Sequence, residues 1–367
     1  MRINSGLFDG HIHTHGGCGV DNYLRNIRDS LSAGGLDGEN LLAVRIASSA
    51  CTADTEALLA KALMPDRLTV YCNPTFQIEG FDTTPEGVAA QVQDFIDAGA
   101  DGVKLADGNA GDGVPLDSEV FDPMFSLMEK TGFPLLYHVG YTVRIPERRT
   151  FQKNRYPVAN FPAVLYHPGG RDDDHEAIEN SSDLMEAKFC QIENMLKKHP
   201  DLHVTFPHMY YMSDQLSRLS DFIECHKNVM IDMTPCSEIF YNLSKDPKKS
   251  REFLCAYSDR LIFGTDNATE WDPLPVITIM KAFFETDEAF FAPAWGFDVR
   301  GVAPLPKDVL ENIYKKSFFR ICEPKTLVPK KTVEFCEKLY DTVRDFPDLP
   351  EANKQEILEC AKRLREM

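Results

Sequence analysis

The amino-acid sequence predicts an α/β fold and, within that class, a (β/α)8 barrel, the TIM barrel. Short apolar runs rich in β-branched or aromatic residues alternate with longer segments of helical periodicity, which is the pattern of a parallel sheet with helical crossovers. Eight such runs are present, as a closed barrel requires. They span residues 6–13, 41–48, 67–74, 100–106, 133–140, 202–208, 228–235 and 260–266. The alternative is a doubly wound open sheet, but no GxGxxG turn follows the first run.

The segments between these runs carry helical signals. Apolar residues recur at helical spacing over residues 88–96, after Thr84 and Pro85, where a hydroxyl can cap the helix and proline suits the first turn. Apolar residues over 216–223 follow Ser213 in the same way. We therefore expect helices between the strands.

Two regions depart from the regular alternation. From Tyr141 to about Ser182, after the fifth strand, the chain is too long, polar and proline-rich for an ordinary connection, which predicts a lid or a substrate-facing excursion. After the eighth strand, residues 307–321 and 331–367 have amphipathic helical patterns. We expect a catalytic barrel of residues 1–322 and a C-terminal helical extension of residues 323–367 packed on it.

Composition excludes several classes of protein. The chain has 367 residues and a formal net charge of -18, which argues against a nucleic-acid-binding or membrane-surface protein, because both need a basic face. Ten cysteines without a CxxC pair indicate reduced thiols. The sequence shows neither a signal peptide nor a membrane span, so a cytoplasmic location is expected. The expected partners are a small-molecule substrate and further copies of the chain in a homo-oligomer.

Five polar residues lie at the tips of predicted strands. His11 and His13 are two residues apart on the first strand, so their side chains point to one side and can bind one ion. His138, His208 and Asp266 end the fifth, sixth and eighth strands. The strand tips of a TIM barrel surround the mouth where active sites are built. Nitrogen and oxygen donors of this kind suit zinc or another first-row divalent ion.

This order of residues resembles the amidohydrolase superfamily. The segments DGHIHTH, GADGVKL, LIFGTDN and LPKDVLENIYKKSFFR are similar to the amidohydrolase-related branch that includes aminocarboxymuconate semialdehyde decarboxylase. The resemblance extends from Phe8 to about Ile321. It implies that His11, His13, His138 and Asp266 bind the metal.

The resemblance also implies a mechanism and a cofactor. His208 and Asp266 would be catalytic: Asp266 would accept a proton from water activated by the cation, and His208 would polarise or protonate a substrate oxygen. Zn²⁺ is the expected ion, with Mn²⁺ as the alternative, and one ion is expected rather than two.

Three further residues are candidates for substrate binding: Lys104, Arg144 and Asn267. Lys104 ends the fourth strand, where binuclear members of the superfamily hold a carboxylated lysine between two metals, so that role remains an alternative. Arg144 belongs to the excursion and could clamp a substrate carboxylate. Asn267 follows Asp266 closely enough to line the pocket. His15, in a glycine-rich loop, is expected to lie at the surface or behind the metal ligands.

The leading functional hypothesis is an enzyme that hydrolyses a small polar substrate, which could carry a carboxylate, with metal-activated water. A lyase, either a decarboxylase or a hydratase, is the alternative on the same scaffold, because loops choose the substrate and the ligands are shared. A barrel that binds a ligand without catalysis is a third possibility, which a missing metal ligand would favour.

Overall fold

The structure is a computed structural model. It describes residues 6–43, 53–76, 78, 80–107, 109–110, 114–139, 181–235, 237–292 and 297–367. Residues 141–180 of the predicted excursion, and with them Arg144, lie outside the described residues.

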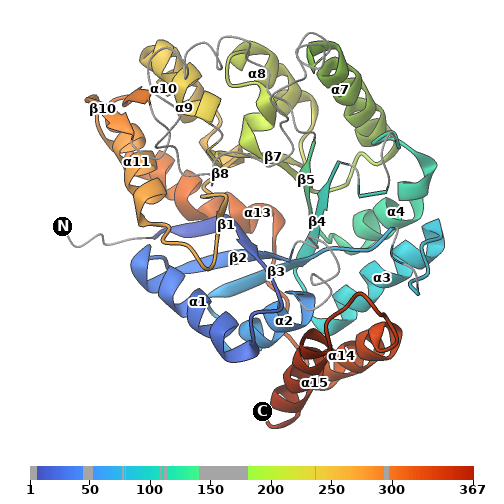
Figure 1. Ribbon diagram of the computed structural model, residues 1–367. Coiled ribbons are helices and arrows are strands. Elements are labelled where there is room, and N and C mark those ends of the chain that lie inside the picture. The colour runs from blue at the N-terminus through green and yellow to red at the C-terminus, as the bar shows by residue number, and fades with distance from the viewer. Residues whose placement is uncertain are drawn as a thin grey trace.

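Nine parallel strands form one curled sheet, and helices surround it (Figure 1). The order in the sheet is β8-β7-β6-β5-β4-β3-β2-β1-β9, so neighbours in space are almost all neighbours in sequence. The strands are β1 (Phe8–Thr14), β2 (Gly38–Ala43), β3 (Leu68–Cys72), β4 (Gly102–Ala106), β5 (Leu135–His138), β6 (Val204–Phe206), β7 (Val229–Asp232), β8 (Leu261–Ile262) and β9 (Asn267–Ala268). Together with the helical crossovers this is a TIM barrel, and the predicted fold class is confirmed.

The barrel closes where the eighth predicted strand meets the first. That strand is split in two: β8 pairs with β7, and β9 pairs with β1. Between them, the Gly10 amide donates to the Phe263 carbonyl at 2.9 Å. A Cβ on Gly10 would lie 2.5 Å from the Ile262 side chain, and one on Gly264 would lie 2.7 Å from that of His11. Glycine at these two positions therefore permits the close approach that closes the ring.

The second strand differs from its predicted position. It begins at Gly38 and ends at Ala43, whereas the apolar run indicated residues 41–48. The polar residues Glu39 and Asn40 belong to the strand because each finds a buried partner: the Ser30 hydroxyl donates to Glu39 at 2.6 Å, and the Asn40 amide donates to the Gly10 carbonyl at 3.2 Å.

The helices occupy the outside of the ring (Figure 1). The Thr84 hydroxyl accepts from the Gly87 amide and caps α3, as the sequence indicates. In chain order the longer helices are α1 (Val20–Ala33), α2 (Ala53–Leu63), α3 (Pro85–Ala98), α4 (Asp122–Thr131), α7 (Ser181–Lys198), α8 (Leu216–Cys225), α9 (Ser237–Lys245), α10 (Pro247–Ala256), α11 (Leu274–Glu285), α14 (Pro329–Val343) and α15 (Glu351–Arg365). Short segments are η2 (Glu119–Phe121), η5 (His208–Tyr211), η6 (Ser258–Arg260), α12 (Lys307–Glu311), η7 (Asn312–Lys316) and α13 (Phe318–Ile321), and β10 (Ala289–Ala292) with β11 (Phe297–Arg300) forms a hairpin.

Two groups of apolar side chains fill the fold. The larger group packs the outer faces of the strands against the helices and includes Val70, Val103 and Leu105. A smaller group includes Phe8, which starts β1, and Phe318 of α13. The Phe318 ring packs against the Phe8 ring in a tilted arrangement, with their centroids 4.7 Å apart, so α13 covers the end of the barrel where the strands begin. The other end, where the strands finish, carries the polar residues.

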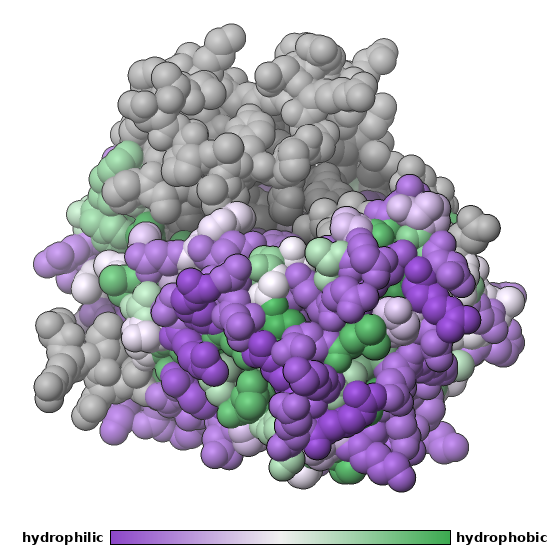
Figure 2. Space-filling view, turned by 60° about the horizontal axis from the view of Figure 1, so that its bottom comes forward, coloured by the Kyte–Doolittle hydropathy of each residue, from purple (hydrophilic) through white to green (hydrophobic). Residues whose placement is uncertain are grey.

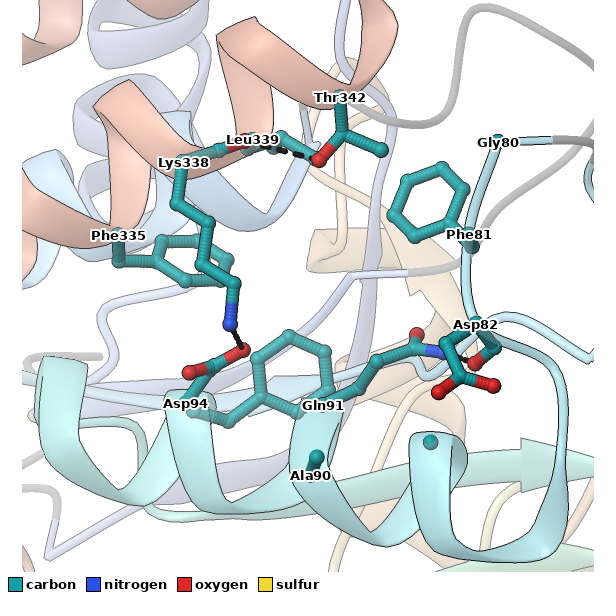
Figure 3. A pocket seen from close by; sticks show the side chains of 12 residues that line it. Gly80, Phe81, Asp82, Ala90, Gln91, Asp94, Phe335, Lys338, Leu339 and Thr342 are labelled. Atoms are coloured by element: carbon teal, nitrogen blue, oxygen red, sulfur yellow. Dashed lines mark hydrogen bonds and ion pairs between the residues drawn. The ribbon is translucent and has the colours of Figure 1, made fainter.

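The last two long helices pack on the outside of the barrel. α14 lies against α3, and α15 lies against α2 and α14 (Figure 1). A pocket of about 250 Å³ lies between α3 and α14, bridged by an ion pair from Lys338 to Asp94 at 2.5 Å (Figure 3). None of the polar strand-tip residues lines it. The division into a barrel of residues 1–322 and an extension of residues 323–367 stays a prediction.

The surface that comes forward when the bottom of Figure 1 is tilted toward the viewer is mostly hydrophilic, with apolar residues in scattered groups (Figure 2). Within the described part of the chain, no helix has both the length and the hydrophobicity to cross a bilayer. The expected homo-oligomer stays a prediction.

Candidate metal centre

Two histidines and one aspartate meet at the mouth of the barrel. His11 and His13 project from β1 with their Nε2 atoms 3.2 Å apart. The Asp266 Oδ1 atom lies 3.0 Å from His13 Nε2 and 3.2 Å from His11 Nε2. One donor atom from each of the three lies within 4.8 Å of the others, which is a geometry that could hold a metal ion.

Asp266 reaches this position through an unusual backbone conformation. Its φ of 56° is in the left-handed region of backbone conformation. Few residues other than glycine adopt this region, and asparagine and aspartate do so more often than the rest. Its amide donates to the His11 carbonyl at 3.0 Å, which ties the strained residue to β1. Strain of this kind is concentrated at functional sites, where the surrounding structure maintains it.

Asp232, at the end of β7, fixes the orientation of His11. Its Oδ2 atom accepts a hydrogen bond from His11 Nδ1 at 2.8 Å, and both side chains are buried. An ionised carboxylate only accepts, so Nδ1 of His11 carries a proton and donates it to Asp232, and Nε2 is the ring atom that faces His13 and Asp266. In the neutral ring, a proton on Nδ1 is the tautomer that a histidine needs to bind a metal through Nε2. Asp232 was not among the residues predicted from the sequence, although it lies at a strand tip like the other candidates.

His208, at the end of β6, is oriented by Thr234. Its Nδ1 atom lies 3.1 Å from the Thr234 hydroxyl oxygen and 3.3 Å from the Thr234 carbonyl. The Thr234 hydroxyl donates its hydrogen bond to Asp232 Oδ1. Toward His208 Nδ1, the hydroxyl oxygen and the Thr234 carbonyl can therefore only accept, so Nδ1 carries the proton of the His208 ring. The Nε2 lone pair therefore faces Asp266, whose Oδ2 atom is 3.9 Å away.

A left-handed turn follows β6. His208, Met209, Tyr210 and Tyr211 have φ values of 57°, 50°, 52° and 55°. Each non-glycine residue in this conformation costs about 1–2 kcal/mol. Met209 and Tyr210 are buried among apolar side chains, and their burial offsets part of that cost. The turn places the His208 and Tyr211 rings side by side, with centroids 5.5 Å apart.

His138 lies beside this group and contacts Tyr211. Its ring centroid is 4.9 Å from that of His208, and its Nε2 atom is 2.6 Å from the Tyr211 hydroxyl. It is not one of the three residues whose donor atoms converge. The structure thus brings together three of the four predicted ligands, and the fourth is near them with its Nε2 hydrogen-bonded to Tyr211. The sequence carried no signal for Tyr211.

Burial and neighbouring charges set the ionisation of the centre. Burial lowers the pKa of His13 to about 4 and the pKa of His208 below its ordinary value, so both rings are neutral at pH 7. Burial alone would lower the pKa of His11, but the Asp232 carboxylate outweighs it and the pKa is raised. Burial would raise the pKa of Asp266, yet hydrogen bonds from His11 and His13 hold it well below the ordinary range.

The remaining candidates occupy different places. Asn267 is buried and its amide donates to the Trp271 carbonyl at 3.2 Å, within the loop after β9. His15 forms an ion pair with Glu270 at 2.7 Å at the partly exposed rim. Lys104 is buried inside the barrel, and its ammonium has no hydrogen-bond partner among the described residues.

The fold and the centre define a class: a TIM-barrel protein whose mouth carries a nitrogen- and oxygen-donor site that fits a divalent cation. The amidohydrolase family model matches residues 19–316, more than half of the chain, and the chain belongs to the amidohydrolase family. The matched range begins after β1, so His11 and His13 lie just outside it. No curated protein matches the chain significantly.

Solved structures share the fold at low sequence identity. An uncharacterized TIM-barrel protein from Bordetella bronchiseptica is 13% identical, with 86% of this chain and 97% of that chain covered and a TM-score of 0.52. A 2,6-dihydroxybenzoate decarboxylase complexed with 2,6-dihydroxybenzoate is 13% identical, with 86% and 99% covered and a TM-score of 0.51. A dihydroxybenzoic acid decarboxylase from Polaromonas sp. JS666, with bound manganese and 2-nitroresorcinol, is 11% identical, with 86% and 96% covered and a TM-score of 0.51.

Proposed function

We propose that this chain is a metal-dependent enzyme that hydrolyses a small polar substrate at the mouth of its barrel. The observation that carries the proposal is the convergence of His11, His13 and Asp266, whose donor atoms lie within 4.8 Å of one another. The hydrogen bond from His11 Nδ1 to Asp232 supports it, because it turns Nε2 toward the centre, where the neutral ring could bind an ion. His138 would become the fourth ligand if its Nε2 atom released the Tyr211 hydroxyl and bound the ion instead.

Zn²⁺ is the ion we propose, with Mn²⁺ as the alternative. Two imidazoles and one carboxylate, with a third imidazole nearby, are donors that either ion accepts. When bound, the cation would supply Lewis acidity and lower the pKa of a coordinated water.

The chain's own residues would move the protons. His208 is neutral, with its Nε2 lone pair toward Asp266, so it is suited to accept a proton and return it to a leaving group. The strongly lowered pKa of Asp266 keeps this side chain a carboxylate that can bind the cation or accept a hydrogen bond from water. The resemblance implies that Asp266 accepts the proton of the water. Because the pKa of Asp266 is strongly lowered, we instead propose that His208 transfers the proton and that Asp266 orients the water.

Decarboxylation is the second candidate reaction. Two of the similar structures are decarboxylases of dihydroxybenzoates, and one of them holds manganese. The same centre would then hold a carboxylated ring. His208 would first take up a proton at Nε2 from a substrate hydroxyl or from water, and would then give it to the ring carbon as the bond from that carbon to the carboxylate breaks and CO₂ leaves.

One experiment tests the proposal and separates the reactions. Zn²⁺- or Mn²⁺-loaded protein is incubated with a panel of carboxylated lactones, amides and hydroxybenzoates, and the products are followed by NMR together with released CO₂. The proposal expects products that have gained water, and this turnover is lost in His208→Gln. Release of CO₂ instead would favour the lyase. No turnover of any kind by metal-loaded protein over a broad panel would count against an enzyme.

A further inference from the structure

We propose that Lys104 is the anion-binding residue of the site, and that the substrate carries a carboxylate which this ammonium binds. The inference rests on the proposed metal-dependent function and adds the class of substrate.

The fold places Lys104 inside the barrel beneath the metal centre. β4 and β5 pair with Ala106 opposite His138 and Lys104 opposite Leu136. Residues two apart on a strand point to the same side, so Lys104 lies one layer below His138 on the inner face. Val103 and Leu105 point the other way, into the apolar group under the helices.

Lys104 is electrostatically coupled to the centre. The carboxylates of Asp266 and Asp232 act to raise the pKa of Lys104, against the effect of burial. The ammonium is therefore within electrostatic range of the centre.

The acceptors of the centre are already used by other donors. Asp232 accepts from His11, Thr234 and the His208 amide, and Asp266 contacts His11 and His13. Neither carboxylate hydrogen-bonds Lys104, and no other acceptor among the described residues does so. A buried ammonium is rarely left in this state, because losing its hydration without a partner is costly.

Another lysine of the chain shows the contrast. Lys61 is buried to the same degree, but its ammonium contacts both Asp101 oxygens, at 2.7 and 2.8 Å, and the Gly99 carbonyl at 2.7 Å. Lys61 is thus a satisfied structural ion pair. Lys104 has the burial of a structural lysine without the partners, as expected of a group kept for a ligand.

A carboxylate fits the ammonium better than a neutral group does. Hydrogen bonds between two charged groups are roughly twice as strong as neutral ones, and a buried site strengthens them further. Burial lowers the pKa of Lys104 to about 8, so the ammonium form prevails at pH 7.

The test compares Lys104→Met with wild type and with Lys61→Met, all loaded with Zn²⁺. Binding of acetate, succinate and benzoate is measured by calorimetry, with benzamide as the uncharged control, and melting temperature and metal content are measured alongside. We expect at least one carboxylate to bind wild type and to bind Lys104→Met about tenfold more weakly or worse, with benzamide unaffected. Lys104→Met should melt no lower than wild type, whereas Lys61→Met should melt lower.

Several outcomes would overturn the inference. They are equal carboxylate affinity in Lys104→Met, failure of all three carboxylates to bind wild type, or a lower melting temperature of Lys104→Met like that of Lys61→Met. Two results would make Lys104 a carboxylated metal ligand instead. One is loss of the metal in Lys104→Met. The other is a ¹³C NMR signal of a lysine carbamate that wild type shows after incubation with ¹³C-bicarbonate and Lys104→Met does not. A wild-type protein that binds no metal would contradict the proposed function itself, which is a separate failure.

Discussion

Asp232→Asn should weaken metal binding without unfolding the protein. Asp232 Oδ1 accepts from the amides of His208 and Thr234 at 3.0 and 3.1 Å, and the asparagine carbonyl can keep these contacts. The asparagine NH₂ then replaces Oδ2, which now accepts from His11 Nδ1 at 2.8 Å. Two donors cannot face each other, so His11 would move its proton to Nε2, and a protonated Nε2 cannot bind a cation.

The size of the effect follows from the single contact that changes. A hydrogen bond to a charged group contributes about 1.5–3 kcal/mol, and loss of a partner that orients a metal ligand typically weakens metal affinity about 10- to 100-fold. We therefore expect Zn²⁺ affinity to fall by about 10- to 100-fold in Asp232→Asn.

The assay is competition for Zn²⁺ against a chelator of known affinity, at pH 7 and constant ionic strength. Asp246→Asn is the matched control: Asp246 accepts from the Lys249 amide at 3.0 Å at the start of α10, where asparagine caps equally well. Circular dichroism checks that both variants are folded. Equal Zn²⁺ affinity in Asp232→Asn, Asp246→Asn and wild type would refute the proposed role of Asp232.

Three other predictions concern stability and the ligand set. Burial raises the pKa of Glu39 to about 8 from 4.5, so the folded state keeps a proton that the unfolded chain has released, and stability falls as pH rises from 4.5 to 8. Glu39→Gln should remove this fall, stabilising the protein by a few kcal/mol above pH 8 and little at pH 4.5 in urea titrations; parallel pH profiles would contradict it. Tyr211→Phe removes the hydroxyl that contacts His138 Nε2, so Zn²⁺ affinity should rise about two- to tenfold by chelator competition, whereas an unchanged or lower affinity would exclude His138 as the fourth ligand. Lys61→Met leaves the buried Asp101 carboxylate without its cation and should lower the free energy of unfolding by about 3–5 kcal/mol; a loss below about 1 kcal/mol would show that the pair is not structural.

The barrel could be predicted because its strands are buried on both faces and appear as short apolar runs. Element boundaries were harder. Glu39 and Asn40 are polar, yet they belong to β2, where the Ser30 hydroxyl donates to one Glu39 oxygen and the Asn40 amide donates to the Gly10 carbonyl. The eighth strand was predicted over residues 260–266, whereas β8 ends at Ile262 and β9 begins at Asn267, directly after the left-handed Asp266.

Part of the candidate site could be predicted, because polar residues at strand tips can be recognised in the sequence. His11, His13 and Asp266 are polar residues at the tips of apolar runs, and the structure brings them together. Asp232 has the same signal in the run NVMIDMTP. Tyr211 could not be found in this way, because its contact depends on a left-handed turn of residues that rarely adopt one.

The metal content of the purified protein shows whether His11, His13 and Asp266 form a metal site. Wild type, His13→Ala and His226→Ala are reconstituted with Zn²⁺ or Mn²⁺, freed of excess ion and measured by elemental analysis. His226 is the control, because its ring pairs with Glu193 at 3.0 Å, away from the centre. We expect about one ion per chain in wild type and His226→Ala and almost none in His13→Ala. No bound metal in wild type, or full retention in His13→Ala, would contradict it.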